Sequence, residues 1–347
     1  TELNKIENHV LQAFNSVNPD EVNKEWLQTQ IDYYYNPPKQ AESIPTNLIK
    51  YIDFYIEYRQ HEITKTSERK FNVIKHKLER FEKYRKKALM INDINESFKN
   101  EFVKFQKKEL YSQNTMQREL VFIKTFCKHA RFLGLETSPQ LDDLKLERQK
   151  VDKIYLSFEE IENIEKEILT ESLDNAKDWL IISCYCAQRI SDFMRFTDKQ
   201  IRIEDGKHFI EFTQKKTGKI TTIPVHPKII EILNKRNGKF PYRISDQKYN
   251  DYIKVVCQLA ELSELTKGSK LVETEPESGI FRKKQGIYPK WELVTSHIGR
   301  RSMSTNFYGI IPTSYLINIT NHATESQFLQ YVGKSSKDMA KDTFKYF

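Results

Sequence analysis

A stretch near the C-terminus holds histidine, arginine and tyrosine side chains at spacings that can bring them to one anion. His297 and Arg300 are three residues apart, so on a helix they share a face. His322 and Tyr331 follow them. Residues 302–324 contain no Asp, Glu, Lys or Arg, although 30% of the chain is charged. We expect this uncharged segment to be packed inside the protein and to frame a site.

Two further cations precede this stretch. Arg189 comes at the end of the most apolar segment of the chain, where its charge would be costly to bury without a partner. Lys216 comes directly before Thr217 and Gly218, a pair that predicts a tight turn projecting from a sheet. Both cations therefore belong to the candidate functional residues.

The common catalytic and cofactor motifs are absent from the sequence. It contains no GxxxxGK[ST], GxGxxG, HExxH or GxSxG, and its four cysteines include no CxxC pair. Nucleotide binding, hydride transfer and zinc proteolysis lose their support. We predict no cofactor and no metal.

The order of the candidate residues resembles the tyrosine recombinase (phage-type integrase) family, and in particular the integrases of conjugative or mobilisable transposons. The resemblance rests on Arg189 in an ARIS-like helix end, Lys216 before Thr-Gly, the HxxR of His297 and Arg300, a histidine 22 residues later and a tyrosine nine residues after it. It covers residues 154–347 and, more weakly, residues 45–135. Two positions differ from the family pattern: Asn321 stands where glycine is common, and Gln188 where leucine is frequent.

The resemblance implies a site-specific DNA recombinase or integrase that cleaves and rejoins strands through a 3′-phosphotyrosyl intermediate and integrates or excises a mobile element. It implies that Tyr331 is the nucleophile and that Arg189, Arg300 and His322 stabilise the phosphate. His297 then binds the phosphate or takes the tyrosine proton, and Lys216 protonates the leaving 5′ oxygen. The implied partners are double-stranded DNA with inverted-repeat core sites, a homotetramer on that DNA, and accessory DNA-bending proteins.

Two other functions fit part of the pattern. A type IB topoisomerase-like nicking and sealing enzyme shares the Arg-Lys-Arg-His-Tyr set but acts as a monomer. A topoisomerase function does not explain the short amphipathic tail at residues 332–347. In recombinases such a tail typically docks on a neighbouring protomer. A non-catalytic DNA-binding protein would use basic helices alone, and it leaves the ordered reactive residues unexplained.

Apolar periodicity and turn residues predict a mainly α fold. We expect a helical core-binding bundle and an α-rich catalytic domain that contains a small antiparallel sheet. In the first domain, residues 45–135, we expect a SAM-like DNA-binding bundle with helices near 46–62, 67–88, 94–110 and 114–133. Residues 136–153 read as a polar linker. Residues 1–44 are expected to be a helical remnant of an arm-binding domain or a linker.

The second domain, residues 154–347, opens with a capping box at Ser157 and Glu160. A helix near 173–187 and a three-stranded meander over 201–225 follow. We then expect helices near 227–235 and 245–264 and a hairpin around Gly286. The last helices should start near Ser296, Pro312, Thr324 and Ser335.

Positive charge is concentrated in the middle of the chain. The net charge is +8 overall, and it is −3 in residues 1–40, +7 in residues 41–150 and +4 in the remainder. Two predicted helices carry basic faces opposite their apolar stripes, and such faces attract phosphate backbones. The predicted DNA-binding residues on them are Arg69, Arg80, Lys83, Lys87, Lys124, Lys128 and Arg131.

Composition limits where the protein works. With 347 residues, 38% of them hydrophobic, the chain is long enough for two or three packed domains. It contains no apolar run that could span a bilayer and no apolar segment typical of a signal peptide. Cys127, Cys184, Cys186 and Cys257 suggest no disulfide framework. We therefore expect a cytoplasmic protein without a membrane partner, and the resemblance implies a bacterial, nucleoid-associated one.

Overall fold

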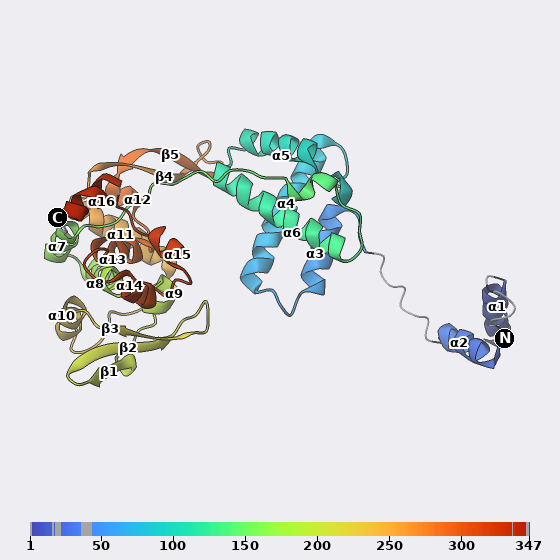
Figure 1. Cartoon of the computed structure of the whole chain (residues 1–347), viewed down its shortest axis with the longest axis horizontal. Helices are drawn as coiled ribbons and strands as arrows, with labels where there is room; N and C mark the ends of the chain where they lie inside the picture. The colour runs from blue at the N-terminus through green and yellow to red at the C-terminus, as the bar shows by residue number, and fades with distance from the viewer. Residues whose placement is uncertain (1, 16, 18–21, 36–43, 335, 345–346) are drawn as a thin grey trace. The chain divides into compact units, whose positions relative to one another are not determined.

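The structure is a computed structural model that describes residues 2–15, 17, 22–35, 44–334, 336–344 and 347 (Figure 1). The chain divides into two compact units, residues 1–148 and 149–347. The predicted fold class is confirmed, because helices dominate both units and the second contains a small antiparallel sheet. Within the described ranges, no helix is both long enough and apolar enough to cross a membrane.

The first unit begins with two helices that pack on each other, α1 (Glu2–Phe14) and α2 (Lys24–Tyr35), and neither contains a buried residue. Four further helices form a bundle, and each lies within a few residues of its predicted range: α3 (Leu48–Tyr58), α4 (Lys65–Arg85), α5 (Glu96–Lys108) and α6 (Gln113–Phe132). Side chains fix three of their starts. Asn47, Thr64 and Asn95 each accept a hydrogen bond from a backbone N–H of the first turn.

Aromatic side chains fill the core of this bundle. Phe81 of α4 contacts Phe98, Phe102 and Phe105 of α5, with ring centroids 5.1 to 5.9 Å apart. One basic residue of the predicted cationic helix is also inside. The Lys77 side chain is 2% exposed, and its Nζ lies 2.6 Å from Glu119 Oε1 of α6. The positive charge of α4 therefore does not all face solvent.

The short 3₁₀ helices η2 (Ile91–Asp93) and η3 (Pro139–Asp142) complete the bundle. The second of them lies in the segment expected to be a linker. Leu141 and Leu144 are buried in the bundle core, so the first half of that segment packs as part of the unit. Most residues of this segment are polar, because only a few of them point into the core.

The second unit contains the remaining elements. Its helices are α7 (Phe158–Lys166), α8 (Glu171–Cys186), α9 (Ile190–Phe193), α10 (Pro227–Lys235), α11 (Asp246–Leu259), α12 (Lys290–Leu293), α13 (Ile298–Asn306), α14 (Thr313–Thr320), α15 (Glu325–Leu329) and α16 (Ser336–Thr343), with the 3₁₀ turn η4 (Asp198–Gln200). The capping box of Ser157 and Glu160 is present at the start of α7. Ser335, where the last helix was predicted to start, lies outside the described residues.

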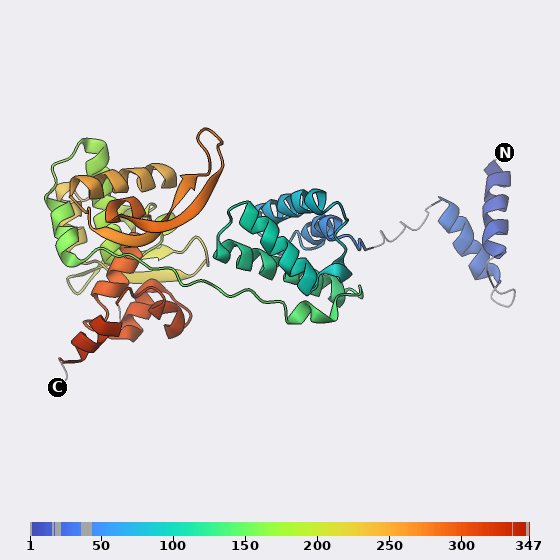
Figure 2. The same ribbon diagram turned by 90° about the horizontal axis from the view of Figure 1, so that it is seen from above.

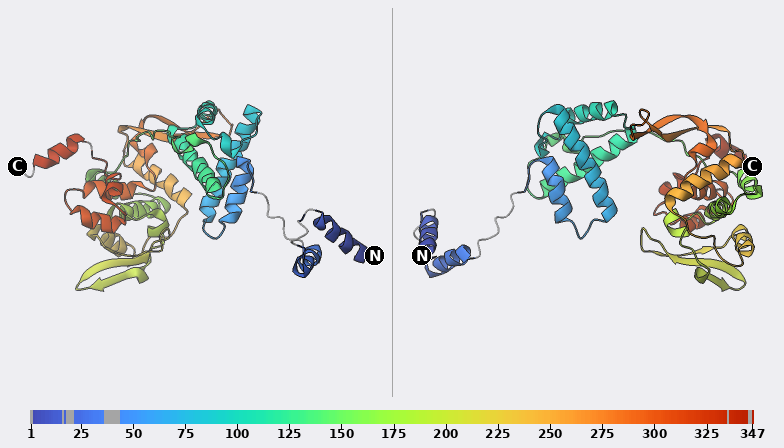
Figure 3. Two further views of the ribbon diagram at one scale, coloured as in Figure 1. Left: turned by 45° about the vertical axis from the view of Figure 1, so that its right-hand side comes forward. Right: turned by 180° about the vertical axis from the view of Figure 1, so that it is seen from behind.

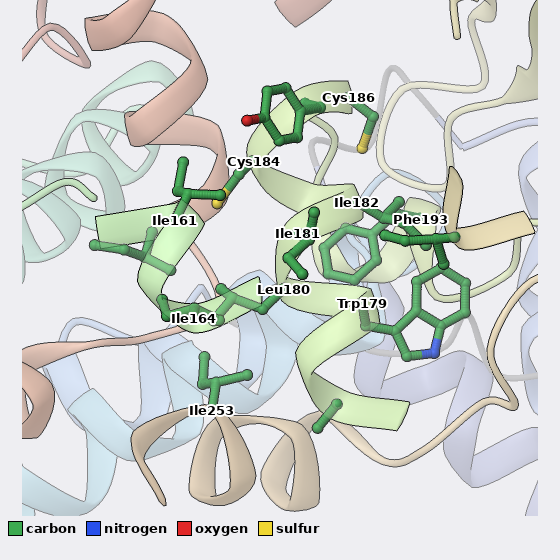
Figure 4. Close-up of a cluster of buried hydrophobic side chains, with 14 of the residues drawn as sticks. Ile161, Ile164, Trp179, Leu180, Ile181, Ile182, Cys184, Cys186, Phe193 and Ile253 are labelled. Carbon is green, nitrogen blue, oxygen red and sulfur yellow. The ribbon is translucent and has the colours of Figure 1, made fainter. Parts of the chain in front are cut away.

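Helix α8 forms the centre of the second unit. Every residue from Asn175 to Cys186 is buried, and Figure 4 shows Trp179, Ile182 and Phe193 packed within this core. Helices α7, α10, α11 and α13 all contact α8. A helix surrounded on all sides gives the unit a rigid axis against which its other elements pack.

The predicted meander is confirmed as three antiparallel strands, β1 (Ile201–Glu204), β2 (Lys207–Thr213) and β3 (Ile220–Pro224). Figures 1 and 3 show this sheet on one side of helices α8, α11 and α13, with the second sheet on the other side. The turn between β2 and β3 contains Lys216. That turn is therefore carried by two paired strands.

The predicted second hairpin is present, but its turn does not lie at Gly286. The second sheet pairs β4 (Leu265–Glu273) with β5 (Phe281–Pro289), and Figure 2 shows it as a long curved ribbon. Gly286 lies in the middle of β5, opposite Gly268. A Cβ atom at Gly286 would lie 2.9 Å from the Tyr288 ring, so this glycine serves a close contact and not a turn.

Candidate active site

Close packing of helices α8 and α13 positions Arg300. Gly299 of α13 faces Ser183 of α8, and a Cβ atom there would clash with the Ser183 hydroxyl and lie 2.6 Å from its backbone carbonyl carbon. Glycine permits this approach. The next residue, Arg300, is thereby brought beside Ala187, which ends α8 in the left-handed conformation with φ of 56°.

The Arg300 side chain is 1% exposed and ties two chain segments together. Its Nη1 donates to the Ala187 carbonyl oxygen at 2.9 Å, and its Nη2 donates to the Thr320 carbonyl oxygen at the end of α14. Nη2 also lies 3.2 Å from His322 Nε2. Burial, followed by the charge of Arg189, lowers the pKa of Arg300 to about 10, so it stays a cation at neutral pH.

His322 follows a turn that ends α14. Asn321 adopts the left-handed conformation there, with φ of 51°, which asparagine tolerates better than most residues. His322 Nδ1 lies 2.8 Å from Thr320 Oγ1, whose hydroxyl donates to the Leu316 carbonyl oxygen. The hydrogen-bond network therefore assigns the hydrogen to Nδ1 and leaves Nε2 as an acceptor for Arg300.

The charge state of His322 follows from its surroundings. Burial first, then Arg300 and Arg189, lower its pKa to about 4. The imidazole is consequently neutral at pH 7. A phosphate in the site would oppose both arginine charges and raise that pKa again.

Tyr331 lies against the same histidine. Its ring centroid is 4.7 Å from that of His322, and the Arg300 guanidinium carbon is 5.4 Å from the Tyr331 ring centroid. The tyrosine follows α15, with its backbone N–H donating to Phe328 O at 2.7 Å. Tyr331, His322 and Arg300 therefore form one cluster, as the sequence predicted.

Arg189 completes the positive side of this cluster. It is the N-cap residue of the short helix α9, directly after the end of α8. Its Nη1 is buried and has no hydrogen-bond partner among the described residues, and the same holds for Arg300 Nε. Guanidinium N–H groups that are buried and unpaired are rare. They point to an anion as the missing acceptor.

The remaining two predicted residues are His297 and Lys216. His297 is the N-cap residue of α13, and burial followed by Arg301, Arg300, Arg189 and Lys216 lowers its pKa. Lys216 is exposed in the turn between β2 and β3. Because its charge acts on His297, the two side chains belong to the same electrostatic site.

Three positioning residues were not predicted from the sequence. Buried Asp192 accepts a hydrogen bond from the Lys215 backbone N–H at 2.8 Å, which joins the Lys216 turn to α9. Buried Gln188 donates to the carbonyl oxygens of Cys186 and Ile319, both at 2.8 Å. Thr320 sets the His322 tautomer. Asp192 follows Arg189 by three residues, and this helical spacing was the available signal that Asp192 lies on the same face as Arg189.

The uncharged segment 302–324 is only partly packed inside, contrary to the prediction. Ser302, Ser304 and Thr305 of α13 are buried, but Ile310 is 64% and Tyr315 63% exposed. Absence of charge does not by itself indicate burial, because apolar side chains also occur on protein surfaces.

The predicted DNA-binding residues have different surroundings in the first unit. Arg80 pairs with Glu109, Lys128 and Arg131 share Asp142, and Lys124 donates to the carbonyl oxygens of Asp142 and Leu144. Lys87 lies beyond the end of α4, which stops at Arg85, and it faces Asp93 at 3.5 Å. Its predicted place on the helix face is wrong, because Lys86 ends the helix in the left-handed conformation. Arg69 and Lys83 are exposed on α4.

Comparisons with known proteins agree with this architecture. Residues 47–135 match the family model of the phage integrase SAM-like domain. The Tn1549 transposon integrase in complex with transposon right end DNA has a TM-score of 0.61 at 15% identity, over 87% of this chain and 99% of that chain. No sequence among the curated proteins matches the chain.

Two other solved structures are similar. A lambda integrase dimer bound to a COC′ core site has a TM-score of 0.60 at 15% identity, over 91% of this chain and 86% of that chain. The XerH site-specific recombinase bound to difH substrate has a TM-score of 0.57 at 13% identity, over 89% and 99%. These relatives are recombination enzymes. Residues 47–135 therefore resemble the phage integrase SAM-like domain, and the chain shares the fold of these solved integrases and of the XerH recombinase.

Proposed function

We propose that the protein is a site-specific DNA recombinase that cleaves and rejoins strands through a 3′-phosphotyrosyl intermediate. One observation carries this proposal. A tyrosine, a neutral histidine and two arginines with unpaired buried N–H groups meet in one site. That set offers a nucleophile and fixed cations to a phosphodiester, and it contains no group for hydride or nucleotide chemistry.

In the proposed cleavage step, the Tyr331 oxygen attacks phosphorus and the bond from phosphorus to the 5′ oxygen breaks. His297 takes the tyrosine proton, because its lowered pKa leaves the imidazole unprotonated and able to accept one. Arg189 and Arg300 hold the non-bridging oxygens through guanidinium hydrogen bonds. Lys216 gives a proton to the leaving 5′ oxygen. Resealing reverses these steps with a 5′-hydroxyl of the partner duplex.

His322 changes its role when the phosphate binds. Without DNA, its Nε2 accepts from Arg300. A phosphate oxygen competes for that Arg300 N–H and raises the pKa of His322, because its charge opposes the nearby arginines. Nε2 then carries a hydrogen that can be donated to the phosphate. His322 thereby supplies a third donor when the substrate is present.

The proposed substrate is double-stranded DNA with inverted-repeat core sites, and the proposed role is to integrate or excise a mobile element. The integrase of Tn1549 and the lambda integrase, both bound to DNA, support this by their similarity. The proposed assembly is a homotetramer on DNA, with accessory DNA-bending proteins as further partners. The exposed Phe344 and Phe347 of the tail, 76% and 97% exposed, suit docking on a neighbouring protomer. Such a protein would work at the bacterial chromosome in the cytoplasm.

A nicked suicide duplex tests the function against its two alternatives. We expect the full chain to form a covalent adduct on a duplex that contains its core site, with EDTA present, because cationic side chains supply the charge stabilisation. We also expect joint molecules between two such sites. A non-catalytic binding protein would give no adduct. A topoisomerase-like enzyme would give the adduct without joint molecules.

The basic helix face has its own test. Arg69 and Lys83 form no ion pair within the described residues, so their charge is available to DNA phosphates. Because each lost phosphate contact flattens the slope of log K against log salt by about 0.9, the Arg69→Ala/Lys83→Ala variant should lose about two units of slope. Binding measured across a salt series checks this.

The matched control is Lys75→Ala. Lys75 lies on the same helix, but its Nζ is 2.6 Å from Asp53. We expect this variant to keep the parent slope. An unchanged slope in the Arg69→Ala/Lys83→Ala variant would mean that this face is only solvated and does not meet DNA.

A further inference from the structure

One hydrogen bond joins two parts of the active site that are far apart in the sequence. Asn321 Nδ2 donates to Thr221 Oγ1 at 3.0 Å. Asn321 directly precedes His322, whereas Thr221 is the second residue of β3 and only 4% exposed. Helix α14 and strand β3 also contact each other. The contact therefore links the His322 turn to the strand that leaves the Lys216 turn.

The Lys216 turn is a short, hydrogen-bonded connection with little freedom of its own. Gln214 N donates to Lys219 O and Gly218 N to Gln214 O, both at 2.9 Å. Gly218 has a φ of 68°, which glycine adopts without strain. These hydrogen bonds tie the turn to β2 and β3, so the anchors of those strands bear on the position of exposed Lys216.

Two anchors hold this piece from opposite ends. Before Lys216, the Lys215 backbone N–H is bound by Asp192 of α9, next to Arg189. After it, Thr221 of β3 is bound by Asn321, next to His322. Lys216 is thereby held between the backbone segment that carries Arg189 and the one that carries His322.

We propose that Asn321 is a positioning residue for Lys216, acting through Thr221. The inference rests on the proposed function and extends it to a residue outside the six predicted active-site residues. Asn321 combines two properties at this position. It tolerates the left-handed backbone that places His322, and its amide reaches β3, which a glycine side chain cannot do.

This role makes a specific chemical prediction. Lys216 protonates the 5′ oxygen as the bond from phosphorus to that oxygen breaks. If sulfur replaces the bridging 5′ oxygen, the leaving group is a thiolate, which leaves without a proton because a thiol has a pKa of about 8.5. A defect that acts through Lys216 should therefore disappear on the sulfur substrate.

The experiment measures the rate of adduct formation by the full chain on two suicide duplexes, one with oxygen and one with sulfur at the bridging 5′ position. Asn321→Gly keeps the backbone conformation and removes the amide. We expect it to slow cleavage of the oxygen duplex about ten- to a hundredfold, since small misplacements of a catalytic group have effects of this size. We expect the parent rate on the sulfur duplex.

Thr221→Val should reproduce both results, because it removes the acceptor and keeps the shape of the side chain. Thr222→Val is the matched control, since the neighbouring Thr222 is exposed on the same strand, and it should cleave both duplexes at the parent rate. Lys216→Ala should be slow on the oxygen duplex and rescued by sulfur. Combining Asn321→Gly with Thr221→Val should add no further loss.

Two results would overturn the inference. Equal slowing of Asn321→Gly on both duplexes would show that Asn321 acts on His322 or on the phosphate and not through Lys216. Parent rates on both would show that the hydrogen bond has no catalytic role. Failure of the proposed function looks different, because the parent itself would then form no adduct on either duplex.

Discussion

Tyr331→Phe should abolish the covalent protein–DNA adduct and leave DNA binding nearly unchanged. The variant removes only the hydroxyl oxygen that would attack phosphorus, while the ring contacts with His322 and Arg300 remain. No other group of the site can replace a missing nucleophile, so the loss should be complete within detection. A suicide duplex with a labelled strand, analysed under denaturing conditions, measures the adduct.

The control for this experiment is a second tyrosine. Tyr315 of α14 is 63% exposed and belongs to the same unit, so it could reach DNA. We expect Tyr315→Phe to form the adduct like the parent. An adduct that persists in Tyr331→Phe would move the nucleophile elsewhere, with Tyr315 and Tyr308 as the next residues to replace.

The sequence was sufficient to predict the elements that carry the site. Apolar periodicity placed the helices of the bundle within a few residues, and turn residues placed the meander. These signals are local, so they survive without knowledge of the tertiary structure. The spacing of His297 and Arg300 also placed both residues at the start of one helix.

Contacts that depend on tertiary structure were not predictable in the same way. Gly286 was predicted to lie in a turn, but it lies within β5, opposite Gly268 of β4. Lys77 is one of the basic residues of the predicted cationic helix, but it is paired with Glu119 inside the bundle. In each case the residue type was ambiguous, and a neighbour distant in the sequence decided its role.

The same limit applies to the supports of the active site. Asp192, Gln188 and Asn321 act through single hydrogen bonds to segments 23 to 131 residues away in the chain. No periodicity reports such a bond. For Asn321 and Gln188 the available signal was a departure from the family pattern, which marked the positions without giving their partners.

Variants of the two arginines should differ in stability, although both should lose cleavage. Arg189→Ala and Arg300→Ala should each slow adduct formation by at least 10²–10³, on the order of what one charge-stabilising donor contributes. Arg300 also donates to the carbonyl oxygens of Ala187 and Thr320 inside the protein. Arg189 has a buried Nη1 without an acceptor in the described part of the chain, and its charge opposes that of Arg300.

Removing Arg300 therefore leaves two carbonyl groups unpaired and a cavity, which should lower the free energy of unfolding by about 2 kcal/mol or more. Removing Arg189 relieves repulsion between like charges and breaks no bond of this kind, so its free energy of unfolding should stay at or above that of the parent. Urea unfolding without DNA measures both. Equal stability of the two variants would contradict the structural role of Arg300, whereas a fully cleaving Arg189→Ala would contradict the phosphate-binding role of Arg189. If Arg189→Ala no longer cleaves DNA but is as stable as the parent, the Arg189 guanidinium serves to bind an anion that only the substrate supplies.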